Sequence, residues 1–303
     1  MNRVLWVCDV PDWAYDINAK VLAKNMPQYE HHYGYINNKN HLLTTMKDFD
    51  TGTVIVIMYP SGLRLCKKLS NVVSILDSVR ALDTTERIEL SCVTGIICCN
   101  EFLFNAVKNI NKNVILQPNG VDLKEYSTPK NFDVFPDKFV VGFAANIAGG
   151  NGEYKGWSFY QKAVQSLGEG IVQLNAIRGP NQIPSNKMVS DFYQKINCLV
   201  LASINEGCSN VITEALACGV PVICTKVGYH GEALTEHEQC IFVERNAESI
   251  RGAILKLVNN PHLYLYMRCR AREFAVQNHD IKMVAATYMK VFQQILDSNL
   301  CRN

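Results

Sequence analysis

The 303-residue sequence contains no hydrophobic run close to the roughly 18 residues that a membrane-spanning helix needs. It also lacks an excess of charge of one sign, because 30 Lys and Arg face 28 Asp and Glu and give a formal net charge of +2. This balance offers no general electrostatic basis for binding nucleic acid or an anionic membrane. The 12 cysteines form no Cys-x-x-Cys pair, and no Asn-x-Ser/Thr sequon occurs. We therefore expect free thiols in a reducing, cytoplasmic environment.

Short apolar runs are plentiful, and they alternate with helix-like segments. Hydrophobic residues make up 48% of the sequence and charged residues 19%, which is typical of a folded globular protein. In the first half, the expected strands are Val4–Cys8, Thr53–Met58, Val72–Leu76, Thr94–Cys99 and Val114–Leu116. The expected helices there are Ile17–Asn25, Leu63–Leu69 and Glu101–Asn109. Strands that are apolar almost throughout predict a parallel sheet covered on both faces.

A second series of the same kind begins near residue 138. Its expected strands are Phe139–Ala144, Ile171–Ala176, Cys198–Ala202, Val220–Cys224 and Ile241–Val243. Its expected helices are Trp157–Ser166, Met188–Lys195, Val211–Cys218, Ala247–Asn259, His262–Val276 and Ile281–Leu296. The aperiodic, proline-containing stretch Tyr126–Lys138 is the expected linker. The pattern predicts two doubly wound α/β domains, residues 1–130 and 131–280, with ligands bound in a cleft between them.

The most informative segment lies between two strands of the second series. A buried strand ends near Ala202, a polar loop containing Gly207 follows, and a helix begins at Ser209 or Asn210. The start of that helix would present free N–H groups and a positive dipole end at the edge of the sheet, which suits a phosphate. Glu214 falls one turn into the helix, where its carboxylate can accept hydrogen bonds from vicinal hydroxyls such as those of a ribose.

The residues from Glu206 to Val222 read EGCSNVITEALACGVPV. This stretch resembles the donor-binding signature of the family 4 retaining glycosyltransferases, glycosyl transferases group 1. Three more pieces fall in the order of that family: Pro118–Asp122, Lys155-Gly156, and Val227-Gly228 with Glu232. The resemblance implies the GT-B fold, in which two Rossmann-like domains face a cleft. Residues 1–130 would then form the acceptor-side domain with the C-terminal helix, residues 281–303, packed back on it, and residues 131–280 the donor domain.

The resemblance also implies a role for each matching residue. Glu206 would hold hydroxyls of the donor sugar, Lys155 would pair with the diphosphate, and Glu214 would bind the ribose. The backbone N–H groups of the next loop residues would contact sugar and phosphate; these are Gly207, Cys208, Ser209, Asn210 and Val211. A UDP- or GDP-linked sugar would be the co-substrate, with no further cofactor and no metal ion. Transfer of a hexose or pentose would proceed with retention of configuration.

The sequence departs from the family pattern at three places. No Arg follows the first donor-domain strand, so Asn146 and Arg178 are the expected donor contacts, with Lys226 as a further candidate. A loop is expected over 147–154, between the end of that strand and Lys155. Leu76 stands where the family often has His, and the adjacent Asp77 either orients a hydroxyl of the acceptor or sugar, or caps a helix.

The first strand leads into a segment without glycine. Asp12, Trp13 and Tyr15 in this segment are expected on the acceptor side. The two aromatic rings either stack on an acceptor ring or cap the core, and the sequence leaves both alternatives open. The acceptor would be a glycan, a lipid-linked molecule, a protein or a nucleic acid. The basic segment 64–68 allows a weak contact with a membrane surface.

Other interpretations compete with this one. Gly150-x-Gly152-x-x-x-Gly156 has one residue too many for a dinucleotide fingerprint, and no acidic residue closes the next strand. Arg268, Arg270 and Arg272 are expected on a solvated surface. The rival functions are a non-catalytic or non-transferring nucleotide-sugar-binding protein, similar to an epimerase or hydrolase, and an enzyme that acts on a modified nucleic acid.

Overall fold

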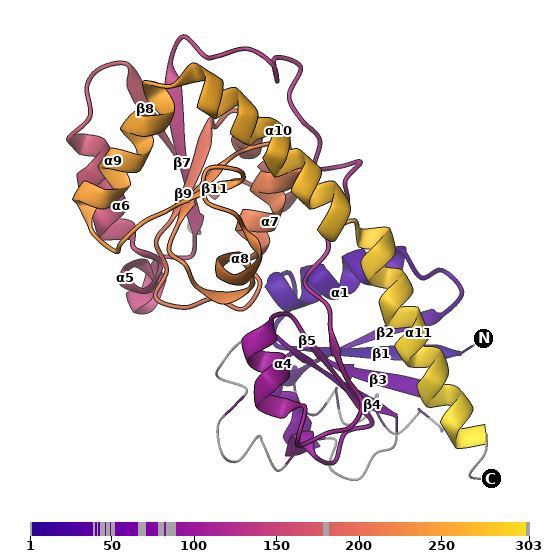
Figure 1. Cartoon of the computed structure of the whole chain (residues 1–303). Coiled ribbons are helices and arrows are strands. Elements are labelled where there is room, and N and C mark those ends of the chain that lie inside the picture. The colour runs from indigo at the N-terminus through magenta and orange to yellow at the C-terminus, as the bar shows by residue number, and fades with distance from the viewer. Residues whose placement is uncertain are drawn as a thin grey trace. The chain divides into compact units, whose positions relative to one another are not determined.

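The computed structural model describes residues 2–38, 40, 42, 46, 49, 52–65, 71–77, 82, 89–177 and 182–300. The chain divides into two compact units. The first unit combines Met1–Gly120 with Ile281–Asn303, and the second is Val121–Asp280. Each unit contains one parallel sheet with helices packed around it, as Figure 1 shows. The expected doubly wound α/β architecture is thus confirmed.

The first unit is built on a six-stranded sheet in the order β2-β1-β3-β4-β5-β6, and all neighbouring strands are parallel. Its strands are β1 (Arg3–Cys8), β2 (Glu30–Tyr35), β3 (Thr53–Ile57), β4 (Val72–Leu76), β5 (Gly95–Cys98) and β6 (Val114–Leu116). The strands β3, β4 and β5 are buried along their whole length. This burial explains why their sequences are apolar without alternation.

The helices whose bounds the structure gives in the first unit are α1 (Ala14–Lys24), α4 (Glu101–Val107) and α11 (Ile281–Leu300), with 3-10 turns at Ile36–Asn38 and Pro60–Leu65. The C-terminal helix α11 returns to pack on α1 and β3. Its Phe292 ring lies 6.2 Å from Trp6 and 5.8 Å from Tyr29, measured between ring centroids. Of the helix expected at Leu63–Leu69, residues 63–65 belong to the 3-10 turn Pro60–Leu65 and residues 66–69 lie outside the described residues.

The second unit has a five-stranded parallel sheet in the order β11-β10-β9-β7-β8. Its strands are β7 (Phe139–Ala145), β8 (Ile171–Ile177), β9 (Cys198–Leu201), β10 (Val222–Cys224) and β11 (Cys240–Phe242). Its α-helices are α5 (Asn151–Lys155), α6 (Trp157–Gln165), α7 (Asn210–Ala217), α8 (Gly228–Ala233), α9 (Ala247–Val258) and α10 (Pro261–Asn278). The segment expected as a helix at Met188–Lys195 is a short π-helix, Val189–Tyr193.

The unit boundary falls between Gly120 and Val121, whereas the sequence analysis placed it near residue 130. Val121 donates its backbone N–H to the carbonyl of His279 over 2.8 Å and forms an isolated parallel bridge with Asp280. The two crossings of the chain between the units therefore lie side by side at Val121 and Asp280.

The stretch expected as a linker, Tyr126–Lys138, belongs to the second unit because its aromatic side chains pack there. The Phe135 ring contacts Tyr264 at 5.5 Å in an edge-to-face arrangement. The Phe132 ring lies 4.6 Å from the guanidinium of Arg268. Proline and polar residues suggested a linker, but the contacts of two partly buried phenylalanine rings decide the packing.

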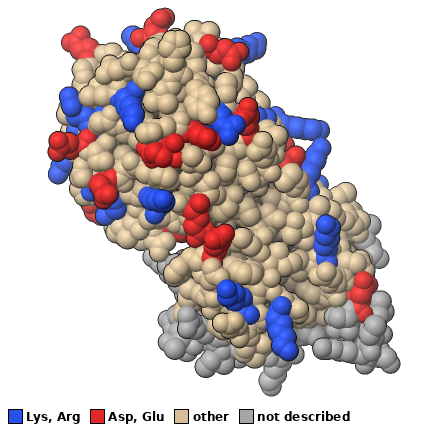
Figure 2. Space-filling view, viewed as in Figure 1, with Lys and Arg blue, Asp and Glu red and all other residues tan. Residues whose placement is uncertain are grey.

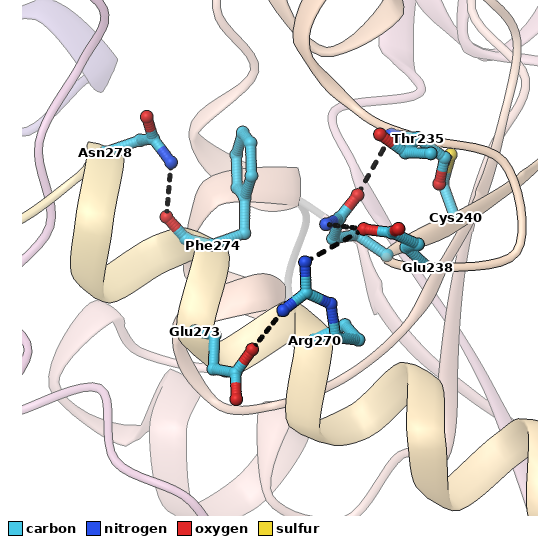
Figure 3. Close-up of polar contacts among 8 residues, drawn as sticks. Thr235, Glu238, Cys240, Arg270, Glu273, Phe274 and Asn278 are labelled. Atoms are coloured by element: carbon cyan, nitrogen blue, oxygen red, sulfur yellow. Dashed lines mark hydrogen bonds and ion pairs between the residues drawn. The ribbon is translucent and has the colours of Figure 1, made fainter.

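The expectation that three arginines of α10 lie on a solvated surface is wrong for two of them. Arg268 is only 3% exposed and donates to the carbonyl of Gly219. Arg272 is partly buried and donates to backbone carbonyls. Arg270 alone stays at the surface, where it forms ion pairs with Glu238 and Glu273 (Figure 3). Amphipathic guanidinium side chains can be buried where carbonyl oxygens and aromatic rings receive them.

Three elements were not expected from the sequence. The strand β2 has the polar sequence EHHYGY and forms the edge of its sheet, so no apolar run marks it. The helices α5 and α8 have five and six residues, too few for a periodic signal. The loop expected over 147–154 instead holds a 3-10 turn at Ala148–Gly150 and most of α5.

Three further features of the described residues bear on the environment of the protein: the surface charge, the hydropathy of the helices and the state of the cysteines. On the face drawn in Figure 2, Lys and Arg are interspersed with Asp and Glu over the described residues. None of the described helices has the length and apolar character that crossing a membrane requires. Ten described cysteines are free, and eight of these are buried.

Candidate active site

The carboxyl end of β9 leads into the loop that the sequence singled out. The loop runs from Ala202 to Ser209, and α7 begins at Asn210, where the sequence analysis expected a helix. Ser209 occupies the N-cap in an extended conformation, and its carbonyl accepts the N–H of Thr213 over 3.0 Å. The first N–H groups of a helix have no intrahelical carbonyl to bind and carry a partial positive charge. This end of the sheet can therefore bind an anion.

Glu206 and Lys155 meet beside this helix start. The Lys155 Nζ donates to Glu206 Oε1 over 2.5 Å, although the two residues are 51 positions apart. The hydroxyl of Ser203 donates to the same carboxylate oxygen over 2.6 Å. The side chains are 26% and 12% exposed, so the pair is only partly screened by water. The ammonium keeps further N–H donors and the carboxylate a second oxygen, which suits a ligand carrying both phosphate and hydroxyl groups.

Backbone contacts fix the end of α5 against the loop after β9. Gly156 follows Lys155 with φ +79°, and a Cβ there would lie 2.6 Å from the carbonyl oxygen of Ala202. Ile204 donates its N–H to the carbonyl of Tyr154 over 2.9 Å. Arg245 donates to the Ala202 carbonyl over 2.9 Å. The Lys-Gly pair thus places the ammonium because only glycine allows the two backbones to approach this closely.

The turn before α8 closes the loop from the other side. Gly228 has φ +59°, and a Cβ there would lie 2.4 Å from the carbonyl oxygen of Glu206 and 2.6 Å from that of Gly207. Tyr229 donates its N–H to the Gly207 carbonyl over 2.8 Å. The Val227-Gly228 piece of the signature therefore supports the backbone that carries Glu206.

Glu214 lies on α7 and is partly buried. The hydroxyl of Tyr193 donates to its Oε2 over 2.6 Å. The pKa of Glu214 is raised to about 7, because desolvation outweighs the hydrogen bonds from Tyr193 and Tyr126 that lower it. This carboxylate can accept further hydrogen bonds, and its pKa lies near neutral pH.

The remaining loop residues differ in exposure. Cys208 and Ser209 are buried at 6% and 8% exposure, so their side chains are poorly placed to reach a ligand. Asn210 and Val211 are partly exposed. Behind the loop, Thr213 contacts Nε2 of the buried His230 at 3.2 Å. The loop is thus backed by a polar contact that the sequence analysis did not foresee.

The contacts expected to replace the missing Arg are only partly described. Asn146 follows β7, and its Oδ1 accepts the N–H of Ala148 over 3.0 Å, which caps the following turn. Arg178 lies outside the described residues. Lys226 is exposed, with its ammonium 5.5 Å from the centroid of the Phe242 ring.

In the first unit, the structure brings together two of the expected acceptor-side residues. The hydroxyl of Tyr15 donates to Asp77 Oδ1 over 2.7 Å, and the Tyr15 ring contacts Tyr59 edge-to-face at 5.5 Å. Burial raises the pKa of Tyr15, and the charge of Asp77 adds to the shift. Trp13 remains 40% exposed at the start of α1. Tyr15 therefore orients Asp77, which sits directly after β4.

Asp12 lies apart from that pair. Its backbone has φ +59°, and its N–H donates to Oδ2 of Asp16 over 2.7 Å. Its side chain is exposed and forms an ion pair with Lys20 at 3.1 Å. These contacts shape the turn that leads into α1.

Three residues of the site escaped the sequence analysis. Ser203 carries a recognisable signal, because it follows the carboxyl end of a strand just before Glu206. Tyr126 and Tyr193 carry none, since nothing in their local sequence indicates contact with Glu214. Among the described residues, no group of three or more His, Cys, Asp or Glu side chains could hold a metal ion.

Two parallel Rossmann-like sheets with the loop after β9 at the carboxyl edge define the GT-B fold. Over nearly its whole length the chain is similar to solved structures of this fold. Sucrose-phosphate synthase from Thermosynechococcus elongatus gives a TM-score of 0.78 at 13% identity, with 98% of this chain and 100% of that chain covered. Anabaena Alr3699/HepE in complex with UDP and glucose gives a TM-score of 0.76 at 12% identity, with 97% and 100% covered.

Residues 150–274 match the family described as Glycosyl transferases group 1. An uncharacterized glycosyltransferase of Methanocaldococcus jannaschii, MJ1178, is 32% identical over 110 residues, which are 36% of this chain and 31% of that protein. The capsular polysaccharide biosynthesis glycosyltransferase CapM of Staphylococcus aureus is 26% identical over 212 residues, covering 59% of this chain and 56% of CapM. The chain thus spans between about a third and about half of the length of these relatives.

Proposed function

We propose that the chain is a retaining glycosyltransferase of family 4 that transfers a hexose or pentose from a UDP- or GDP-linked donor. The observation that carries the proposal is the Lys155–Glu206 ion pair beside the start of α7. The end of α5 supplies a cation for the diphosphate, the loop after β9 a carboxylate for sugar hydroxyls, and the start of α7 N–H groups for phosphate.

The proposed catalysis depends on positioning and on charge neutralisation. As the bond between the sugar and the diphosphate breaks, the acceptor hydroxyl forms the new glycosidic bond on the same face of the sugar and passes its proton to the leaving diphosphate. Lys155 and the N–H groups at residues 207–211 stabilise the negative charge on that diphosphate. When the donor binds, before that step, Glu206 leaves Lys155 and accepts hydrogen bonds from the sugar hydroxyls, while Glu214 accepts them from the hydroxyls of the ribose. Asn146 and Arg178 are further proposed donor contacts. No metal ion or other cofactor takes part in this scheme.

The first unit provides the acceptor side in this proposal. Asp77, oriented by Tyr15, receives a hydroxyl of the acceptor or sugar, and Trp13 and Asp12 lie on neighbouring turns. CapM acts in capsular polysaccharide biosynthesis, and TuaC of Bacillus subtilis is a putative teichuronic acid biosynthesis glycosyltransferase. We therefore favour a glycan or lipid-linked glycan as acceptor over a protein or nucleic acid. The ten free cysteines favour a reducing, cytoplasmic environment.

Similar structures support the choice of donor. Complexes of Alr3699/HepE contain UDP and UDP-glucose, and a pneumococcal O-GlcNAc transferase was solved with UDP and GlcNAc. These ligands belong to those proteins, and they make UDP the first nucleotide to test with this chain.

The test is thermal unfolding with UDP, GDP, ADP, CMP and NAD, followed by assays with the matching sugar nucleotides. Ligand at 100 times its dissociation constant should stabilise the protein by about 2.7 kcal/mol, which raises the melting temperature by several degrees. In Glu214→Ala the loss of a charged hydrogen-bond partner should weaken binding about 10- to 150-fold, or about 1.5–3 kcal/mol. Equal binding by wild type and Glu214→Ala would contradict the site.

Transfer must then be separated from binding alone. A bound donor that is hydrolysed, epimerised or left intact with every glycan acceptor offered would favour the non-transferring alternative. Product configuration determined by NMR decides retention, since an inverted anomer excludes the proposed mechanism.

A further inference from the structure

Two phenol side chains from separate segments converge on Glu214. Tyr193 ends the π-helix Val189–Tyr193 and is fully buried, with its hydroxyl 2.6 Å from Glu214 Oε2. The Tyr126 phenol lies close enough to this carboxylate to lower its pKa through hydrogen bonding. The two rings pack against each other with their centroids 5.9 Å apart. The position of the Glu214 carboxylate is thus determined by side chains that lie outside α7.

Tyr126 is itself fixed to α7 through α10. Arg272 donates to the carbonyl of Tyr126 over 2.7 Å and also to the carbonyl of Ala217, the last residue of α7. The Tyr126 N–H donates to the carbonyl of Asp122 over 2.8 Å. Because one guanidinium binds both the carbonyl of Tyr126 and the end of α7, the backbone that carries the phenol is fixed relative to Glu214.

The charges around Glu214 show what the phenols do. The pKa of Glu214 is raised to about 7: desolvation raises it most and the charge of the neighbouring Glu125 adds to this, whereas the two phenols lower it. The thiol of Cys218, one turn along α7, lies close enough that Glu214 raises its pKa, and Arg272 opposes that shift. Hydrogen bonds to an ionised carboxylate favour the ionised form.

We propose that Tyr126 and Tyr193 are positioning residues of the donor site, which orient the Glu214 carboxylate toward the hydroxyls of a nucleotide ribose and favour its ionised form by hydrogen bonding. A carboxylate has about four acceptor positions, so two remain for a vicinal diol after the phenols have bound. The inference rests on the proposed function, because it takes Glu214 as the ribose ligand.

The first experiment measures the ionisation of Glu214 without ligand. Protein labelled with ¹³C in the Glu carboxyl groups is titrated by NMR, and the resonance missing in Glu214→Gln is assigned to Glu214. Tyr126→Phe and Tyr193→Phe should each move the titration midpoint to higher pH, because each removes a hydrogen bond to the ionised form. A midpoint raised by one unit means about a tenfold smaller ionised fraction well below it.

The second experiment measures UDP and GDP binding by calorimetry between pH 6 and pH 9. Each Phe variant should bind the preferred nucleotide several-fold more weakly than wild type at pH 7, and should converge on wild type at pH 9, where Glu214 is ionised in all of them. A purely structural role would weaken binding by the same factor at every pH.

Tyr160→Phe is the matched control. The Tyr160 hydroxyl is buried in the same unit and lies 2.8 Å from Asn175 Oδ1 and 3.1 Å from the carbonyl oxygen of Val141, so its one proton is directed to these acceptors and not to Glu214. Its loss should lower the melting temperature and leave both the midpoint of Glu214 and the pH profile of binding unchanged.

The outcomes separate the inference from the function on which it rests. Unchanged midpoints in both Phe variants, or a weakening independent of pH, would overturn the positioning role while Glu214→Gln still loses affinity. Nucleotide binding by Glu214→Gln that equals wild type, or no binding by wild type, would overturn the donor site itself and the inference with it.

Discussion

At the scale of single residues, two glycines allow neighbouring backbone segments to pack closely against the loop of residues 202–209, which carries Glu206. Gly156 and Gly228 both have positive φ, and a Cβ at either position would collide with carbonyl oxygens of residues 202, 206 or 207. The carbonyls belong to the backbone, which cannot rotate aside like the end of a flexible side chain. These contacts explain why glycine follows Lys155 and Val227.

Gly156→Ala should therefore destabilise the protein by about 2 kcal/mol or more, since strain at a positive φ adds to a backbone clash. Urea unfolding of the variant and of wild type gives this difference. Gly252→Ala on α9 is the matched control, because a Cβ at Gly252 meets nothing within 4 Å. It should be neutral or stabilise α9 by up to about 1 kcal/mol. Equal effects of the two substitutions would contradict the packing at Gly156.

Glu214 predicts a pH dependence of stability. Its pKa is raised from 4.5 to about 7 in the folded protein, so between these values the folded state holds a proton that the unfolded state has released. Stability should fall as the pH rises from about 4.5 to 7, and this effect should be complete above 7. At about 1.4 kcal/mol per pKa unit, the total is on the order of 3 kcal/mol.

The measurement compares urea unfolding of wild type and Glu214→Gln from pH 5 to pH 8. The Gln variant should be close to wild type at pH 5 and should gain stability relative to wild type toward pH 8. A constant difference across this range would show that Glu214 does not titrate within it.

At the scale of elements, α10 holds the segment of residues 123–126, which follows the unit boundary, against α7. Arg272 donates to the carbonyls of Leu123, Tyr126 and Ala217, the last of which belongs to α7. Burial lowers the pKa of its guanidinium. The contact joins three segments that are far apart in the sequence, so α10 supports the donor site without touching a ligand.

Arg272→Met should cost about 1–3 kcal/mol, because carbonyls in a partly buried position lose a charged donor. Arg251→Met on the exposed face of α9 should stay within about 0.5 kcal/mol of wild type. Chemical unfolding of both variants checks the difference, and a neutral Arg272→Met would contradict the bridging role.

At the scale of the whole molecule, the proposed donor contacts all belong to the unit Val121–Asp280. This unit has its own hydrophobic core, and its length is within the range of independently folding domains. The chain crosses between the units at Gly120–Val121 and at Asp280–Ile281. The unit can therefore be expressed as one continuous segment.

Residues 121–280 alone should unfold in one cooperative transition and bind the nucleotide diphosphate that the full chain prefers. Circular dichroism during heating and calorimetry with that nucleotide test both points. An affinity more than tenfold below that of the full chain would mean that the first unit contributes about 1.4 kcal/mol or more to nucleotide binding.

The architecture could be predicted because its signals are local. Strands such as β3, β4 and β9 are apolar throughout, and the loop and helix of residues 206–222 follow from one continuous stretch. The edge strand β2 and the short helices α5 and α8 could not be predicted, since a polar edge and a few residues leave no periodic pattern.

The sequence by itself determined two parallel α/β sheets and the residue types of the donor loop, because buried strands and helix starts depend on neighbouring residues. Only the tertiary structure decided that Lys155 pairs with Glu206 across 51 positions and that Arg272 reaches Tyr126 across 146. It also decided that two phenols hold Glu214. Such contacts depend on how strands and helices stack, and a one-dimensional pattern of apolar and polar residues does not contain that information.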